Sequence, residues 1–300
     1  MTYPSISKTA LNTIINGNAY DPYYSYKSPI DLYDIHQFTN GQPFEAYADL
    51  RKNSPIYFQN PPDWDIEPGA WMLTSYKDIV EVSSNPKIFS SQAATGNLIT
   101  LGDPETRHPK LWQTSIDHML NLDGSFHLDL RREHMPFFKP GYVDELHKKV
   151  EIKVNDLLDV IAKVGKSNLV KDLSQQIPIF TLSEVLGIPE EDRHKLATWM
   201  EFLELAQYLS AENLKQQTGN EEEMEVDPSM IELFENMVNE MFDYGKYILQ
   251  EKRNNPQNDL LSAIANAELG GAKLSQEYLD GSWLLIIFAG NDTTRNSISG

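Results

Sequence analysis

The stretch that decides the fold lies near the end of the chain and runs Ser282-Trp283-Leu284-Leu285-Ile286-Ile287-Phe288-Ala289-Gly290-Asn291-Asp292-Thr293-Thr294-Arg295-Asn296. Its first part is a run of seven consecutive non-polar residues, Trp283–Ala289. A surface helix needs a polar side, so this run predicts a helix that is buried on all sides in the middle of a large domain. The acid and the two threonines that follow cost free energy to bury. They therefore indicate either a functional site or a specific structural contact.

We expect this helix to begin near Ser275 and to continue to the end of the chain, over about 26 residues or ~39 Å. Helical spacing places six residues on one face: Leu285, Phe288, Ala289, Asp292, Thr293 and Asn296. Ala289-Gly290 removes side-chain bulk, which suits a planar ligand or a small diatomic molecule with a proton donor beside it. A threonine hydroxyl can also bond back to a carbonyl and distort the helix. The alternative is a tight crossing of two helices at Ala289-Gly290, with the acid paired to Arg295.

The rest of the chain is predicted to be mainly α with a small β-sheet, in a single domain over residues 1–300. Two short apolar runs between Pro and Gly predict strands at 56–58 and 71–74. Helical periodicity and stop signals predict helices over 44–51, 76–82, 126–138, 142–164, 173–186, 190–208, 228–253 and 259–267. Residues 87–122 lack a clear pattern and are interpreted as a lid or binding loop, or as disordered.

Composition excludes several classes of protein. The formal net charge of −19 argues against nucleic acid or an anionic membrane as a partner. The absence of cysteine excludes disulfides, thiolate catalysis and cysteine-based zinc or iron–sulfur sites within these residues. No apolar stretch follows Met1, and the longest apolar run is too short to span a bilayer. We therefore expect a cytoplasmic protein without a membrane anchor.

A second motif lies upstream, in Asp123-Gly124-Ser125-Phe126-His127-Leu128-Asp129-Leu130-Arg131. His127 and Arg131 are four residues apart, so on a helix both side chains can converge on a pair of carboxylates. Taken alone, His127 is better explained as a histidine at the surface or in the first turn of a helix.

These two motifs together resemble the cytochrome P-450 family of haem-thiolate monooxygenases. Ala289–Thr294 fits the family's oxygen-binding signature of small residue, Gly, any residue, acid, Thr and hydroxyl. Asp123, His127 and Arg131 have the spacing of bacterial members, although those usually carry prolines where Gly124 and Ser125 stand, so the turn before the helix is expected to differ. Phe138-Lys139-Pro140 matches the family's stop after this helix, and the order of predicted elements agrees over essentially the whole chain.

The resemblance implies a role for each of these residues. His127 and Arg131 would bind the propionates of haem b, and Ala289 and Gly290 would leave room for O2. Thr293 would hydrogen-bond the bound O2, and Asp292 would control proton delivery. An apolar pocket would be formed by Leu285, Phe288, Ile99, Leu101 and Phe202.

The implied reaction inserts one oxygen atom from O2 into a C–H bond of an apolar small molecule such as an alkane, a fatty acid or a sterol. Electrons would come from a ferredoxin or a similar carrier. The residues Arg295–Ser299 are similar to those of members that act on alkanes, fatty acids or steroid side chains.

The chain departs from the family in one respect. The family's haem iron is held by a cysteine near the C-terminus, beyond a Glu-x-x-Arg helix, and this chain contains no cysteine. We therefore expect an N-terminal fragment that ends in the central helix and that is inactive and poorly folded alone. The alternatives are a natural end at Gly300, with the glycine as a helix cap, and a non-catalytic helical binding or interaction protein.

Overall fold

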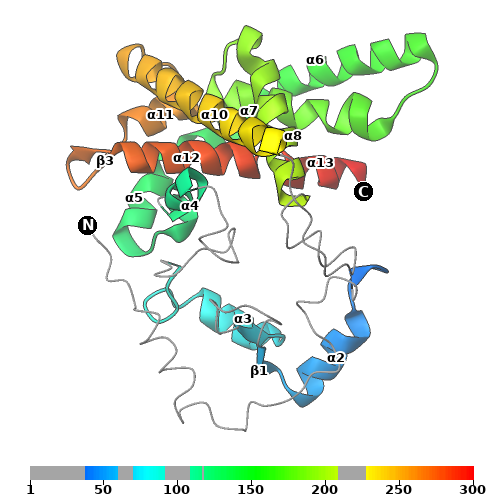
Figure 1. Ribbon diagram of the computed structural model, residues 1–300, viewed down its shortest axis with the longest axis vertical. Helices are drawn as coiled ribbons and strands as arrows, with labels where there is room; N and C mark the ends of the chain where they lie inside the picture. The colour runs from blue at the N-terminus through cyan, green and yellow to red at the C-terminus, as the bar shows by residue number, and fades with distance from the viewer. Residues whose placement is uncertain (1–37, 60–69, 92–108, 117, 209–227) are drawn as a thin grey trace. The chain divides into compact units, whose positions relative to one another are not determined.

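The computed structural model describes residues 38–59, 70–91, 109–116, 118–208 and 228–300 (Figure 1). The chain falls into two compact units, Met1–Trp112 and Gln113–Gly300. Within the described residues, none of the helices combines the length and the apolarity that a membrane span requires. The loop at 61–69, the acidic connection at 219–225 and most of the expected lid segment lie outside the described residues.

The N-terminal unit contains the small sheet that the sequence predicts. Its elements are α2 (Phe44–Asn53), β1 (Ile56–Gln59), β2 (Ala70–Leu73) and α3 (Tyr76–Ser83). The two strands are antiparallel, with Tyr57 opposite Met72. Leu50 of α2 and Tyr57 of β1 are both buried and form a small apolar core between helix and sheet. Ser75 stands at the N-cap of α3, but its side chain makes no capping hydrogen bond.

The C-terminal unit is almost entirely helical. Its longer helices are α5 (Gly124–His134), α6 (Pro140–Val164), α7 (Gln176–Leu186), α8 (Arg193–Tyr208), α10 (Pro228–Asn254), α11 (Leu260–Asn266), α12 (Gln276–Ala289) and α13 (Asp292–Ser299). Short turns of 3-10 or π-helix join several of them: η4 (Met119–Asn121), η5 (Met135–Phe138), η6 (Val170–Ser174) and η7 (Glu190–Asp192). These bounds confirm the predicted helices to within a few residues.

Two elements were not predicted. The first is α4 (Pro109–Ile116), which lies inside the segment expected to be irregular, so that expectation is wrong for these eight residues. The second is a short hairpin of β3 (Glu268–Leu269) and β4 (Ala272–Lys273) directly before α12. Its turn, Gly270-Gly271, has φ of +63° and +83°, a backbone conformation that glycine adopts without steric cost.

Helix α12 forms the centre of the C-terminal unit, as its apolar sequence predicts. It packs against α8, α10 and α11 (Figure 1), and a ring contact between Phe126 and Tyr278 joins its first turn to α5. Trp283 is 1% exposed and donates a hydrogen bond from Nε1 to the carbonyl oxygen of Met241, at 3.0 Å. The ring fits here because α10 carries Gly245, where a Cβ atom would lie 2.6 Å from the indole.

The expected single helix from Ser275 to the chain end is interrupted, which corrects the prediction. Helix α12 ends at Ala289 and α13 begins at Asp292, with the turn Gly290-Asn291 between them. The hydroxyl of Thr293 donates to the carbonyl oxygen of Ala289 at 3.2 Å. This is the side-chain bond to the preceding turn that was expected to distort the helix.

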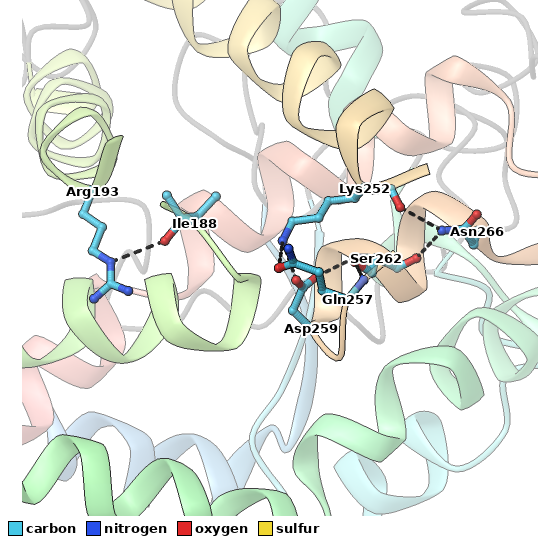
Figure 2. A network of polar contacts seen from close by, with 7 residues as sticks. All are labelled: Ile188, Arg193, Lys252, Gln257, Asp259, Ser262 and Asn266. Atoms are coloured by element: carbon cyan, nitrogen blue, oxygen red, sulfur yellow. Dashed lines mark hydrogen bonds and ion pairs between the residues drawn. The ribbon is translucent and has the colours of Figure 1, made fainter. Parts of the chain in front are cut away.

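A buried ion pair joins the ends of three helices (Figure 2). Lys252 near the end of α10 is 5% exposed and pairs with Asp259, which is 4% exposed. Asp259 also caps α11 by accepting a hydrogen bond from the backbone N–H of Ser262 at 2.7 Å. Gly187, which ends α7 with φ +66°, lies so close that a Cβ atom there would overlap the Asp259 carboxylate. The three helix ends are therefore held at one point.

The close contact between Gly245 and Trp283 predicts how a larger residue at position 245 would change the stability. Gly245→Ala should destabilise the fold by about 1–3 kcal/mol, because the new methyl group overlaps the Trp283 ring in a packed core. The free energy of unfolding in urea measures the change. The matched control is Gly141→Ala in α6, where no atom lies within 4 Å of the added Cβ. Equal stability of the two variants would contradict the packing described for Trp283.

Candidate active site

The break between α12 and α13 defines one side of the candidate site. Ala289, the last residue of α12, is exposed, and so is Thr293 in the first turn of α13. Leu285 is buried, and Phe288 is half-buried. The predicted face therefore passes from the core to an open surface at the point where the helix is interrupted.

Gly290 is explained by its packing. A Cβ atom at this position would lie 2.8 Å from the side chain of Leu182 in α7 and 2.9 Å from the carbonyl oxygen of Ile286. Close approach of α7 thus accounts for the glycine, which is the helix-crossing alternative raised from the sequence. Room for O2 at this site remains a prediction, and the exposed Ala289 is the residue on which it rests. Asp292 opens α13, but its side chain is outside the described part of the structure.

Helix α5 supplies the second side. Gly124 begins it with φ +63°, a value that the proline ring cannot adopt. The turn therefore differs from one with proline at this position, as expected from the resemblance. Three residues later, His127 is half-buried and its Nδ1 donates to the carbonyl oxygen of Met119, at 3.1 Å. This bond fixes the orientation of the ring and leaves Nε2 as the nitrogen that can meet a ligand.

Arg131 is exposed one helical turn after His127, so the structure keeps both residues on one face of α5. Among the described residues, Arg131 forms no ion pair, whereas the adjacent Arg132 binds Asp129 at 2.6 Å. A half-buried, oriented imidazole and an exposed guanidinium on one face match the needs of a ligand with two carboxylates. Their role in binding propionates remains a prediction.

The remaining predicted pocket residues are only partly described. Phe202 in α8 is half-buried, and its ring stacks on Phe234 of α10 with 5.5 Å between centroids. Ile99 and Leu101 lie outside the described residues. An apolar pocket formed by these residues therefore stays a prediction.

Two buried histidines near the site were not singled out from the sequence. His118, just before η4, is 1% exposed, and neither ring nitrogen has a hydrogen-bond partner among the described residues. His134, at the end of α5, is 7% exposed, and burial lowers its pKa to about 4. A histidine on a helix gives no sequence signal for burial, because its size and polarity suit a surface as well as a core.

Three comparisons with known proteins bear on this site. A scan against protein-family models found no match. A steroid C26-monooxygenase from Mycolicibacterium smegmatis is 27% identical over 277 residues, which cover 91% of this chain and 60% of that protein. A linalool 8-monooxygenase from Pseudomonas putida is 26% identical, over 90% of this chain and 62% of that protein.

Comparison with solved structures also finds bacterial cytochromes P450. A Mycobacterium marinum cytochrome P450, CYP268A2 in complex with pseudoionone, superposes with a TM-score of 0.68 and is 27% identical, over 90% of this chain and 63% of that one. The Bacillus subtilis cytochrome P450 PksS, at 24% identity, matches the fold with a TM-score of 0.63. The chain is therefore similar to bacterial cytochromes P450 over about nine tenths of its own length, and it spans about three fifths of the length of these relatives.

Members of this family carry haem b on a cysteine thiolate, and this chain has no cysteine. The residues that are present suit the rest of a haem site. Arg131, and His127 when its ring is cationic, offer donors on one face of α5, and Ala289 at the end of α12 is exposed. His118 and His134 are too buried to serve as exposed donors.

The pKa of His134 predicts how stability depends on pH. The folded protein holds this ring neutral down to about pH 4, whereas the unfolded chain takes up the proton near pH 6.5. Its contribution is therefore intact above about pH 6.5 and is lost as the pH falls towards 4, by about 3 kcal/mol in total.

The measurement compares urea unfolding at about pH 7 and about pH 5, where this residue alone should account for about 2 kcal/mol of the difference. His134→Leu removes the titrating group and should reduce the pH dependence by that amount. A similar pH dependence in both proteins would show that His134 is accessible to protons in the folded state.

The face of α5 gives a second prediction for the site. Arg131→Met should weaken haem binding roughly tenfold, since one charge-assisted hydrogen bond to a propionate is lost. Arg132→Met is the matched control because it removes the same charge from the neighbouring position, where the side chain already pairs with Asp129. Spectroscopic titration with haem measures both affinities. Equal losses in the two variants would indicate a general effect of charge.

Proposed function

We propose that the protein is a haem-dependent monooxygenase that inserts one oxygen atom from O2 into a C–H bond of an apolar substrate. The observation that carries this proposal is the interruption of α12 at Gly290-Asn291, with the Thr293 hydroxyl bonded to the Ala289 carbonyl. An acid and a threonine stand where the buried apolar helix ends, so they can supply a proton path beside an apolar face. Haem b, bound through a thiolate, supplies the O2 activation.

The Thr293 hydroxyl is the group we assign to proton handling. Its hydrogen is directed at the Ala289 oxygen, so its own oxygen can accept a hydrogen bond from a water molecule or from Asp292. Rotation of the hydroxyl would turn its hydrogen from the Ala289 oxygen to another acceptor, so that the group passes on this proton, accepts one in its place and keeps its own charge. Asp292, the adjacent carboxyl group, is the source from which we propose that the proton comes.

His127 and Arg131 are the residues we assign to orienting the cofactor. The Met119 carbonyl holds the imidazole in place before any ligand arrives, so little side-chain entropy is lost on binding. Arg131 is exposed and extends from the same face of α5, and its planar guanidinium suits a carboxylate. Together they would neutralise the two propionates at one edge of the ring.

The substrate class is also part of the proposal. Leu285 and Phe288 precede Ala289 on the predicted face, which favours an apolar molecule held against the end of α12. Two relatives are named for a steroid and for linalool, so a steroid or terpenoid is the first class to test, ahead of alkanes and fatty acids. The electron donor we propose is a ferredoxin-type carrier, which would meet the exposed Arg132 of α5 through its acidic surface.

The role of Thr293 is tested in a preparation that includes the thiolate-bearing part of the family fold. Thr293→Ala should lower the yield of product per O2 consumed severalfold, because the proton no longer arrives in step with the reaction. Thr294→Ala is the matched control, since it removes the neighbouring exposed hydroxyl. Unchanged coupling in Thr293→Ala would contradict the assignment.

The 300 residues alone are expected to lack activity, because they contain no cysteine to supply the electron donation of a thiolate. The difference spectrum of the reduced protein with carbon monoxide tests this directly. A thiolate-type Soret band from these residues with haem would refute the expectation. A band typical of histidine ligation, or none, would agree with it.

A further inference from the structure

Four aromatic rings in the C-terminal unit form a continuous series from the core to the surface. Trp283 of α12 lies 6.3 Å from Trp199 of α8, and Trp199 lies 5.3 Å from Tyr244 of α10, between ring centroids. Tyr244 lies 6.1 Å from Tyr247 on the same helix and 5.9 Å from Trp283. Both tryptophans are 1% exposed, Tyr244 is 8% exposed, and Tyr247 is 59% exposed. The series thus has one end in the central helix and the other in solvent.

Tyr244 has a proton acceptor in place. Its hydroxyl donates to Oδ2 of Asp192 at 2.9 Å, and the other carboxylate oxygen of Asp192 pairs with Lys195 at 2.7 Å. The hydrogen bond from Lys195 holds the pKa of Asp192 below its usual range. Burial and the neighbouring carboxylate raise the pKa of Tyr244. Tyr244 is therefore protonated in the resting protein and adjoins an ionised base.

We propose that Trp283, Trp199, Tyr244 and Tyr247 carry an oxidising equivalent between the central helix α12 and the solvent. Tryptophan and tyrosine are the side chains that give up one electron most readily after cysteine, and this chain has no cysteine. Neighbouring rings within about 6–7 Å are in the range of ordinary ring contacts, so each transfer crosses little more than van der Waals contact.

Each step balances in electrons and protons. A one-electron oxidant removes an electron from Trp283, and Trp199 then refills it, which leaves a tryptophan radical cation at Trp199. Tyr244 gives an electron to Trp199 and its hydroxyl proton to Asp192, and so becomes a neutral tyrosyl radical. Tyr247 restores Tyr244 with one electron while Asp192 returns the proton, and Tyr247 loses its own proton to water. A reductant in solution then donates a hydrogen atom to Tyr247.

The oxidant inside the protein would be supplied by the haem site, so this inference rests on the proposed function for its source. Trp283 precedes Ala289 by six residues on α12, or about 9 Å along the helix axis. Core packing alone does not account for all of the features. It explains the two tryptophans and the need of the buried Tyr244 hydroxyl for a partner, but it does not require that partner to be an ionised carboxylate, or the last ring to be exposed.

The test oxidises the exposed end of the series, at Tyr247, and needs no haem. Since the chain has no cysteine, Asp243→Cys provides a single thiol one turn before Tyr247 for a ruthenium polypyridyl photo-oxidant. A flash with a sacrificial cobalt acceptor generates the oxidant, and electron paramagnetic resonance identifies the radical that remains. The expected result is a hydrogen-bonded tyrosyl radical that disappears in Tyr244→Phe, where the ring packing is kept.

Two further variants identify the route. Tyr247→Phe removes the first ring that is oxidised, and Asp192→Asn removes the proton acceptor, so each should lower the yield of the buried radical severalfold. The same label at Glu235→Cys, on the same helix but about 18 Å from Tyr247 along the axis, should give a severalfold lower yield of the buried radical. Circular dichroism confirms that each variant is folded.

Radicals confined to Tyr247, or a yield that neither Tyr247→Phe nor Asp192→Asn changes, would overturn the proposal. Because haem takes no part, a failed monooxygenase test leaves this result standing, and failure here leaves the monooxygenase function open.

Discussion

The buried ion pair between Lys252 and Asp259 is the contact on which the arrangement of the C-terminal unit depends. Two charges removed from water are costly unless each is fully bonded. Here one oxygen of Asp259 caps α11 and the other meets Lys252, which also donates to the Oε1 atom of Gln257 at 3.1 Å. Removal of either partner would leave an isolated buried charge, a change that typically costs about 3–5 kcal/mol. The pair therefore specifies one geometry for the ends of α7, α10 and α11.

This junction also sets where α12 enters the core. Arg253, the neighbour of Lys252, donates from Nε to the carbonyl oxygen of Ala265 at 2.7 Å and from Nη2 to that of Leu274 at 3.1 Å. These two carbonyls flank the β3–β4 hairpin, so α10 holds both ends of the segment that leads into α12. Further along α12, Trp283 packs against Gly245 of α10. The position of Ala289 and Thr293 follows from contacts made well before them in the chain.

The sequence predicted most of this fold because its signals were local. The seven apolar residues of 283–289 have no polar face, and proline or glycine marks the end of nearly every predicted helix. The position of the interruption after Ala289 was harder to predict, although the sequence did suggest a bond from a threonine hydroxyl back to a carbonyl. The approach of Leu182 of α7 to Gly290 joins residues far apart in the chain, so no local signal reveals it. The burial of His134 and the pairing of Lys252 with Asp259 were missed for the same reason. Lys252 and Asp259 are seven positions apart, and no pattern in the sequence links them, so only the folded chain shows that they pair.

The site itself was predicted by motif, and its two halves lie in one compact unit. We propose that a haem binds between the face of α5 with His127 and Arg131 and the end of α12 with Ala289 and Thr293. The direct test is the nuclear magnetic resonance spectrum of the isotope-labelled protein with paramagnetic iron(III) protoporphyrin, compared with the diamagnetic zinc form. We expect the broadening to be strongest for the amides of 127–131 and 289–293. Broadening centred on the exposed apolar residues of α6, or spread evenly over the protein, would contradict it.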